Sequence, residues 1–415
     1  MTAPFITEFP AIYERVATLL PKKPWRKTVN DIELLSRQIA GRGGQEQVEN
    51  PIAFGLTFWE RHHYDQPVGY EWNTMLEAML FSKRVLDLWD VVEQGGLGPP
   101  DLKKRFTGGF KFAADMRALQ FELYMAATLS SRGCIIEWPE ESKGIETFDL
   151  LVYLPGGTTP FELECKSFAG DKGFAVRMAD GHRVIGAVLE RVSLSDTLSS
   201  EDGRVSILTI SISNPVPKSA TEFKALIDRL VCAIQSRKAY DDNNGIRIQY
   251  DYCEVVGDPD HQDACINTAY RLPGPMVAFV RCSDIEDRLM GIRVISEADI
   301  KLWDEVEKVA RKAMDVQLTG TRPGALALQF INDTVEPFDN VLGTSSQYHR
   351  LSEKLFKREH GVALILASSI ELYPEMPEPP YRADAFQTEA CKVAALYNPS
   401  HDFPIAKLKA LLDPY

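Results

Sequence analysis

Residues Phe148–Ser167 read FDLLVYLPGGTTPFELECKS, and this stretch decides the fold that we expect. It contains two apolar runs separated by the turn-forming residues Pro155-Gly156-Gly157. In the second run, apolar and charged residues alternate from Phe161 to Lys166, which is the period of a strand with two unlike faces. The stretch therefore predicts two adjacent strands that carry acidic and basic side chains on one face.

Four charged residues of this stretch are candidates for chemistry. Asp149 is the one carboxylate of the first run, and fourteen residues separate it from Glu164 in the second run. A turn of this kind brings the two carboxylates side by side, where they and the backbone carbonyl of Cys165 can bind Mg²⁺ or Mn²⁺. Lys166 shares the face of Glu164 and can orient water, take its proton or offset charge on a phosphate. Glu162 shares that face too, and we expect it to support a ligand or to face water.

The pattern resembles the PD-(D/E)xK superfamily of metal-dependent nucleases, which has the restriction-endonuclease-like fold. The match is Asp149 followed by Glu164-Cys165-Lys166, and the resemblance covers residues 113–237. The family tends to carry a glutamate on the helix before the first strand, and Glu122 occupies the corresponding place. Phe148 stands where the motif has proline, and the sequence shows no convincing Gln-x-x-x-Tyr helix of the kind seen in Mrr-like members.

The predicted elements follow the order of the family's core. They are a helix with Glu122, strands at 134–138, 148–154 and 161–167, a helix at 183–192 and a strand at 205–213, giving α-β-β-β-α-β. We therefore expect an α/β fold with a mixed sheet flanked by helices, a helical N-terminal region at 1–105, a nuclease core at 106–245 and an α/β region at 246–415. The last region either extends the sheet or forms a second domain.

The resemblance implies a Mg²⁺- or Mn²⁺-dependent endonuclease that hydrolyses phosphodiester bonds in nucleic acid. DNA is favoured over RNA as the substrate, and the role is in restriction, repair or antiviral defence. Asp149, Glu164, Lys166 and Glu122 are then the catalytic residues, and Asp149, Glu164 and the Cys165 carbonyl are the metal ligands. A homodimer or a regulatory protein partner fits this class. The alternative is a non-catalytic scaffold or nucleic-acid-binding subunit that retains the fold. A third alternative is that the motif has no chemical role, and that Glu164 and Lys166 simply pair with each other on a solvated face of the strand.

The charge balance argues against nucleic-acid binding by the protein as a whole. With 46 basic and 59 acidic residues, the formal net charge is −13, and repulsion opposes phosphate binding. Three local basic clusters could still bind phosphate: Lys22, Lys23, Arg26 and Lys27 around Trp25; Lys103, Lys104, Arg105 and Lys111; and Arg350, Lys354, Lys357 and Arg358. The loop 167–182, with Lys172, Arg177 and His182, is a further candidate, and His182 is a candidate proton carrier.

Other classes of function find little support in the sequence. The seven cysteines show no C-x-x-C spacing, which argues against a zinc site or a disulfide framework. There is no G-x-S-x-G, no H-E-x-x-H and no phosphate-binding P-loop. The chain also contains no basic segment leading into an apolar one at its start and no run of eighteen apolar residues. We therefore expect a cytoplasmic protein without a membrane segment.

Overall fold

A computed structural model describes most of the chain as two compact units. The described residues are 6–38, 46–47, 49–63, 69–96, 98–139, 148–194, 198, 204–237, 239–242, 245–254, 264–282, 289–299, 301–331, 346–368 and 393–412. The first unit is Met1–Val29, Asn50–Gly170 and Trp303–Tyr415, and the second is Asn30–Glu49 and Asp171–Leu302. The units therefore alternate along the chain, whereas the sequence predicted three consecutive regions.

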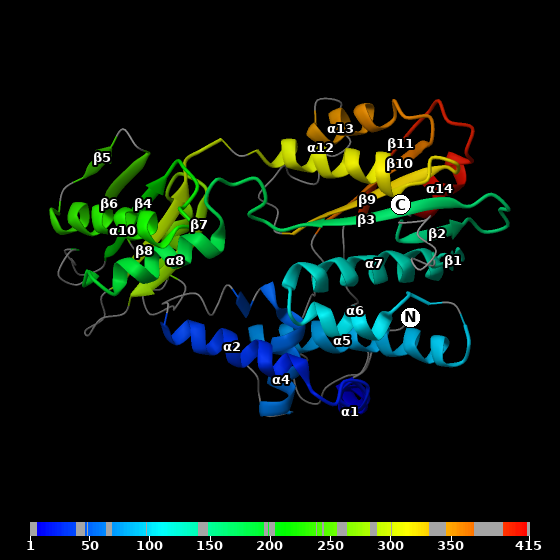
Figure 1. The fold of residues 1–415 in the computed structure, drawn as a ribbon, viewed down its shortest axis with the longest axis horizontal. Coiled ribbons are helices and arrows are strands. Elements are labelled where there is room, and N and C mark those ends of the chain that lie inside the picture. The colour runs from blue at the N-terminus through cyan, green and yellow to red at the C-terminus, as the bar shows by residue number, and fades with distance from the viewer. Residues whose placement is uncertain are drawn as a thin grey trace. The chain divides into compact units, whose positions relative to one another are not determined.

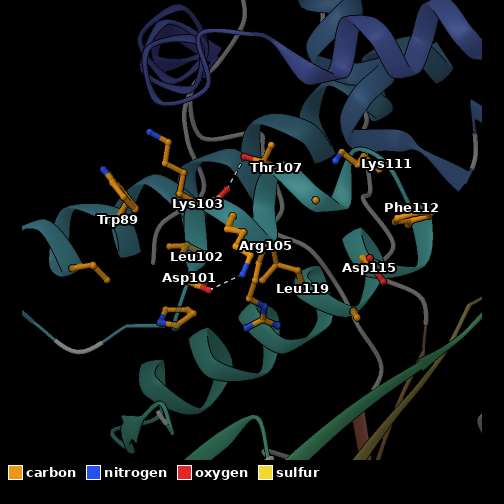
Figure 2. Close-up of a pocket in the computed structure, with 15 residues that line it drawn as sticks. Trp89, Asp101, Leu102, Lys103, Arg105, Thr107, Lys111, Phe112, Asp115 and Leu119 are labelled. Atoms are coloured by element: carbon orange, nitrogen blue, oxygen red, sulfur yellow. Dashed lines mark hydrogen bonds and ion pairs between the residues drawn. The ribbon is translucent and has the colours of Figure 1, made fainter. Parts of the chain in front are cut away.

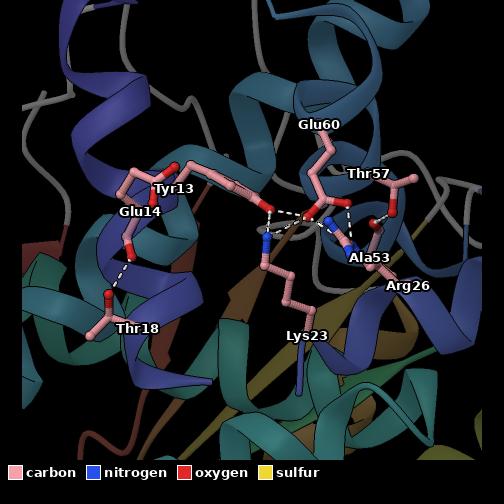
Figure 3. A network of polar contacts seen from close by, with 8 residues as sticks. All are labelled: Tyr13, Glu14, Thr18, Lys23, Arg26, Ala53, Thr57 and Glu60. Atoms are coloured by element: carbon pink, nitrogen blue, oxygen red, sulfur yellow. Dashed lines mark hydrogen bonds and ion pairs between the residues drawn. The ribbon is translucent and has the colours of Figure 1, made fainter. Parts of the chain in front are cut away.

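The N-terminal part of the first unit is helical, as expected. Its helices are α1 (Phe9–Leu19), the start of α2 (Pro24–Gln38), α4 (Pro51–His62), α5 (Gly69–Glu93) and α6 (Leu102–Gly109). Aromatic rings connect them, since the Phe9 ring lies 5.9 Å from that of Trp59 and 6.0 Å from that of Trp72. Figure 3 shows a polar network in this region, in which Tyr13, Lys23 and Arg26 converge on Glu60.

A six-stranded mixed sheet forms the rest of the first unit. Its strands are β1 (Ile135–Glu137), β2 (Leu150–Tyr153), β3 (Phe161–Phe168), β9 (Gly324–Phe330), β10 (Gly361–Ala367) and β11 (Val393–Tyr397), and they lie in this order across the sheet. The central pairs β3–β9 and β9–β10 are parallel, and the outer pairs are antiparallel. The central strands are almost entirely buried, as strands covered on both faces must be.

Helices cover both faces of this sheet. One core joins α7 (Ala113–Ser131) and α14 (Ile405–Leu412) to alternate residues of β3, including Leu163 and Cys165. On the other face, Trp303 of α12 (Leu302–Lys312) and Tyr348 of α13 (Gln347–Leu355) pack against Phe330 of β9. Figure 1 shows α12 and α13 on one side of β3 and β9, and α7 on the other. The π-helical turn η3 (Ala313–Gln317) follows α12.

The expected order α-β-β-β-α-β is present in the first unit, but its last two elements are not those predicted. The helix and strand predicted at 183–192 and 205–213 do form, as α8 (Met178–Leu189) and β4 (Arg204–Ile212). Both belong to the second unit, so their assignment to the sheet of β2 and β3 was wrong. The helix α12 and the strand β9 complete the order instead, because β9 pairs in parallel with β3.

The second unit is a five-stranded mixed sheet with helices on it. Its strands lie in the order β5 (Tyr240–Asp242), β6 (Ile246–Glu254), β4, β8 (Leu289–Ser296) and β7 (Met276–Cys282). The helices α8 and α10 (Ala220–Gln235) share one large apolar core with the sheet, and α11 (Ala264–Arg271) shares a smaller one. Arg293 is buried in β8, where its guanidinium donates to Thr209 and to three backbone carbonyls.

Among the helices that the structure describes, none is both long enough and apolar enough to cross a membrane.

Candidate active site

The start of β2 brings Asp149 against the motif strand. β2 and β3 are antiparallel, and their pairing ends with Leu150 opposite Leu163. Asp149, one residue earlier, therefore lies beside the next part of β3, where its Oδ2 accepts the backbone N–H of Cys165 at 2.7 Å. The predicted juxtaposition of Asp149 with the Glu164-Cys165-Lys166 segment is confirmed.

The backbone of Cys165 offers the predicted carbonyl on the same side as Asp149. In a strand, the N–H and C=O of one residue point to the same neighbour, and the N–H of Cys165 points to Asp149. The carbonyl of Cys165 lies two residues beyond the last β2–β3 pair. Its thiol is in the apolar core, and burial raises the pKa of that thiol well above its usual value. Cys165 therefore offers its backbone to the site, while its thiol belongs to the apolar core.

Glu164 is the most unusual side chain of the site. It is completely buried, its Oε1 accepts from Nζ of Lys166, and its Oε2 is buried without a hydrogen-bond partner. Burial, followed by repulsion from Asp149, raises the pKa of Glu164 from 4.5 to about 8, against the opposing effect of Lys166. Because buried polar atoms are almost always partnered, this oxygen leaves room for a proton or a cation.

Lys166 carries the positive charge of the site. Burial by itself would lower the pKa of its ammonium group, but the carboxylates of Glu164 and Asp149 outweigh that effect and raise the pKa above 10.5. Its side chain retains 27% exposure, while that of Glu164 retains 1%. The ammonium group is therefore charged at neutral pH and partly accessible, whereas the carboxylate beside it is enclosed.

Glu122 lies near Glu164, and it binds Arg105 in a contact that the sequence did not reveal. Glu122 is 3% exposed on α7, and its carboxylate binds both terminal nitrogens of Arg105, one at 2.9 Å. Its negative charge contributes to the raised pKa of Glu164. Arg105 was assigned only to a basic cluster from the sequence. Its position on α6, seventeen residues before Glu122, is the signal that could have suggested a contact across the α6–α7 hairpin.

Two other residues considered from the sequence have different roles. Glu162 is completely buried, and it binds the backbone N–H and the hydroxyl of Thr319 and the guanidinium of Arg322. It therefore anchors the segment that leads into β9. His182 is buried on α8 in the second unit, with Nδ1 at 3.0 Å from the carbonyl of Met178, so the prediction that it lies in a polar loop was wrong.

The residues present are compatible with a metal ion held by few protein ligands. Within the described ranges, no three or more His, Cys, Asp or Glu side chains are arranged to hold a metal ion. Asp149 and Glu164 supply two carboxylates, and the Cys165 carbonyl is a third oxygen. Mg²⁺ commonly binds one or two carboxylates and keeps several waters, and the buried Oε2 of Glu164 has an unused lone pair. The donor set therefore fits a hard divalent cation.

Comparisons of the chain with protein-family models, with curated proteins and with solved structures gave no match.

Proposed function

We propose that the protein is a divalent-metal-dependent nuclease of the PD-(D/E)xK type, which hydrolyses phosphodiester bonds in DNA. The observation that carries this proposal is Glu164, a fully buried carboxylate with one unpartnered oxygen and a pKa raised to about 8 beside Asp149. Two carboxylates that repel each other in an enclosed site favour a cation between them. The motif resemblance assigns the same residues to metal binding.

The ligands that would hold the ion are Asp149, Glu164 and the Cys165 carbonyl. When bound, a divalent cation supplies Lewis-acid stabilisation of a phosphate and makes water more acidic. Asp149 is oriented for this by its hydrogen bond to the Cys165 N–H. Glu164 must lose its proton first, so we expect metal binding to strengthen as the pH rises towards about 8.

The remaining residues act on charge and position. The raised pKa of Lys166 makes its ammonium group a cation at neutral pH, which favours stabilising charge on the phosphate over acting as a general base. Glu122 adds negative charge near Glu164, and Arg105 fixes its orientation by a two-point contact. Arg105 is therefore a positioning residue, because its guanidinium acts through Glu122.

The proposal is tested by incubating purified protein with supercoiled plasmid, linear duplex DNA, single-stranded DNA and RNA. Each substrate is tested with Mg²⁺, Mn²⁺ or EDTA, beside the variants Asp149→Asn and Lys166→Met. A matched control is Glu162→Gln, which removes a buried carboxylate from the same strand but outside the motif. We expect metal-dependent cutting that the first two substitutions abolish and the control retains. Cutting that survives both would refute the assignment of the site.

A second candidate is a non-catalytic scaffold or nucleic-acid-binding subunit. One observation favours it: the pairs Glu164–Lys166 and Glu122–Arg105 already place a cation beside each buried carboxylate. Mn²⁺ titration separates the two functions, because a scaffold has no need for an ion at Asp149 and Glu164. Binding of Mn²⁺ that Asp149→Asn weakens supports the nuclease, and absence of binding supports the scaffold.

A further inference from the structure

In each of the three basic clusters in the sequence, two of the four cations bind carboxylates within the protein. In the cluster around Trp25, Lys23 and Arg26 bind Glu60 (Figure 3). Trp25 itself is completely buried. In the C-terminal cluster, Lys354 and Arg358 bind carboxylates of α12 and the π-helical turn. The aromatic residue inside each of these two clusters is enclosed, completely at Trp25 and partly at Phe356, whereas Phe112 beside the third cluster is 64% exposed.

The third cluster lines a groove in the first unit. The groove has a volume of about 970 Å³ and lies between the end of α5, the helix α6 and the start of α7. Figure 2 shows Lys103 beside Trp89 at one end and Lys111 beside Phe112 at the other. Four of the lining residues are basic and two are acidic, so this surface is locally positive in a protein whose formal net charge is −13.

Two of the four cations in the groove are available to a ligand. Lys104 pairs with Asp101 at 3.1 Å, and Arg105 pairs with Glu122. Among the described residues, neither Lys103 nor Lys111 pairs with a carboxylate. Lys103 lies in the first turn of α6 and Lys111 lies two residues beyond the end of that helix, so they can contact phosphates that are not adjacent.

Aromatic rings accompany these two lysines. The Nζ of Lys103 lies 5.8 Å from the centre of the Trp89 ring. Phe112 follows Lys111 directly and is 64% exposed, so its ring is open to a ligand. Aromatic rings next to cations are the arrangement used for unpaired nucleic-acid strands, whose bases stack while their phosphates pair with lysine. A paired duplex has no free base face to offer such a ring.

We propose that this groove binds a single strand of nucleic acid, with Lys103 and Lys111 on its phosphates and Phe112 stacked on a base. The inference deepens the proposed function and rests on it for the identity of the substrate. Arg105 lines the groove, and its guanidinium holds Glu122, whose charge acts on Glu164. Arg105 therefore connects the groove to a carboxylate that acts on the candidate active site, and we expect the preferred substrate to be an unpaired region of DNA.

The test measures binding of a fluorescent 20-nucleotide DNA strand, and of the same sequence as duplex, by anisotropy at several salt concentrations. EDTA is present throughout, so that no catalysis is required. The variants are K103Q/K111Q and Phe112→Ser. The matched control is K407Q/K409Q, which removes two exposed lysines from α14 in the same unit.

The expected result is that K103Q/K111Q weakens single-strand binding about 25-fold at 0.1 M salt and lowers the salt slope by about 1.4, the effect of two lost phosphate contacts. Phe112→Ser weakens it about 5-fold or more. The control remains within about 2-fold. Equal binding by all variants, or a preference for duplex that Phe112→Ser leaves unchanged, would overturn the proposal.

The outcomes for the groove and for the active site are separable. Loss of binding in the groove variants, with cutting that survives Asp149→Asn, would support the groove and refute the proposed catalytic site. Metal-dependent cutting that Asp149→Asn abolishes, with undiminished binding by the groove variants, would support the catalytic site and refute the groove.

Discussion

Replacing Glu164 with glutamine is expected to reduce the dependence of stability on pH in the metal-free protein. The folded state holds the Glu164 proton up to about pH 8, whereas an unfolded chain releases it near 4.5. Stability contributed by this group is therefore complete below about pH 4.5 and is lost as the pH rises to about 8. The difference between these two pKa values corresponds to at most about 5 kcal/mol of unfolding free energy. Because glutamine also removes the anionic partner of Lys166, we expect about 2–3 kcal/mol of relative stabilisation at pH 9.

Urea unfolding followed by tryptophan fluorescence measures this effect. All six tryptophans belong to the first unit, so the signal reports on the unit that contains the site. A difference of about 2 kcal/mol moves the unfolding midpoint by about 1 M urea. At pH 5 the midpoints of wild type and Glu164→Gln should nearly coincide, and at pH 9 the variant should unfold at higher urea. Glu162→Gln is the matched control, and the lost bonds to Thr319 and Arg322 should destabilise it at both pH values by about 1–3 kcal/mol.

The same experiment with Mn²⁺ tests the metal site directly. At a concentration 100 times its dissociation constant, a ligand that binds only the folded state stabilises it by about 2.7 kcal/mol. We expect this gain for the wild type at pH 8 and its loss in Glu164→Gln. Parallel midpoints for wild type and Glu164→Gln from pH 5 to pH 9, or an undiminished gain from Mn²⁺ in that variant, would refute the reasoning.

Three further substitutions test the neighbouring residues. Asp149→Asn keeps an oxygen for the Cys165 N–H but removes a charge that raises the pKa of Glu164. The pH-dependent loss of stability should therefore be complete below pH 8, and Mn²⁺ should bind more weakly. An unchanged pH profile in the urea titrations would contradict this. Arg105→Leu removes the cation that binds the buried carboxylate of α7, and the first unit should lose about 3–5 kcal/mol at pH 7, as measured by the urea midpoint. Lys166→Met should lower the rate of cutting by about 100-fold or more without abolishing Mn²⁺ binding, which calorimetry can measure.

The strands of the site were predictable because their information is local. The alternation from Phe161 to Lys166 and the Pro-Gly-Gly turn specify two neighbouring strands within twenty residues. Their antiparallel pairing then places Asp149 opposite the motif strand without help from the rest of the chain. The helices of the N-terminal region were predictable for the same reason, since their apolar stripes repeat every three or four residues.

The surroundings of the site were not predictable, because they depend on contacts distant in sequence. Glu162 and Glu164 share one face of the same strand, so the alternation of the sequence cannot tell which of them belongs to the site. Thr319 and Arg322, more than 150 residues away, bind the first and leave the second for other chemistry. The contact of Glu122 with Arg105 depends on how two helices meet, which the hydrophobic pattern of each helix does not specify.

The long segment between β3 and β9 explains why the motif was identified although the sheet was not. The second unit contributes residues 171–302 to this segment, and parallel strands tolerate long connections because the entropy of loop closure grows only with the logarithm of length. Lengthening such a connection from about 30 to about 150 residues costs about 1.4 kcal/mol, which the buried β3–β9 pairing can offset. The residues proposed for chemistry all precede the segment, on α7, at the start of β2 and on β3. Their arrangement is therefore set by short-range structure, whereas β9, the strand that pairs with β3, follows the second unit in the sequence.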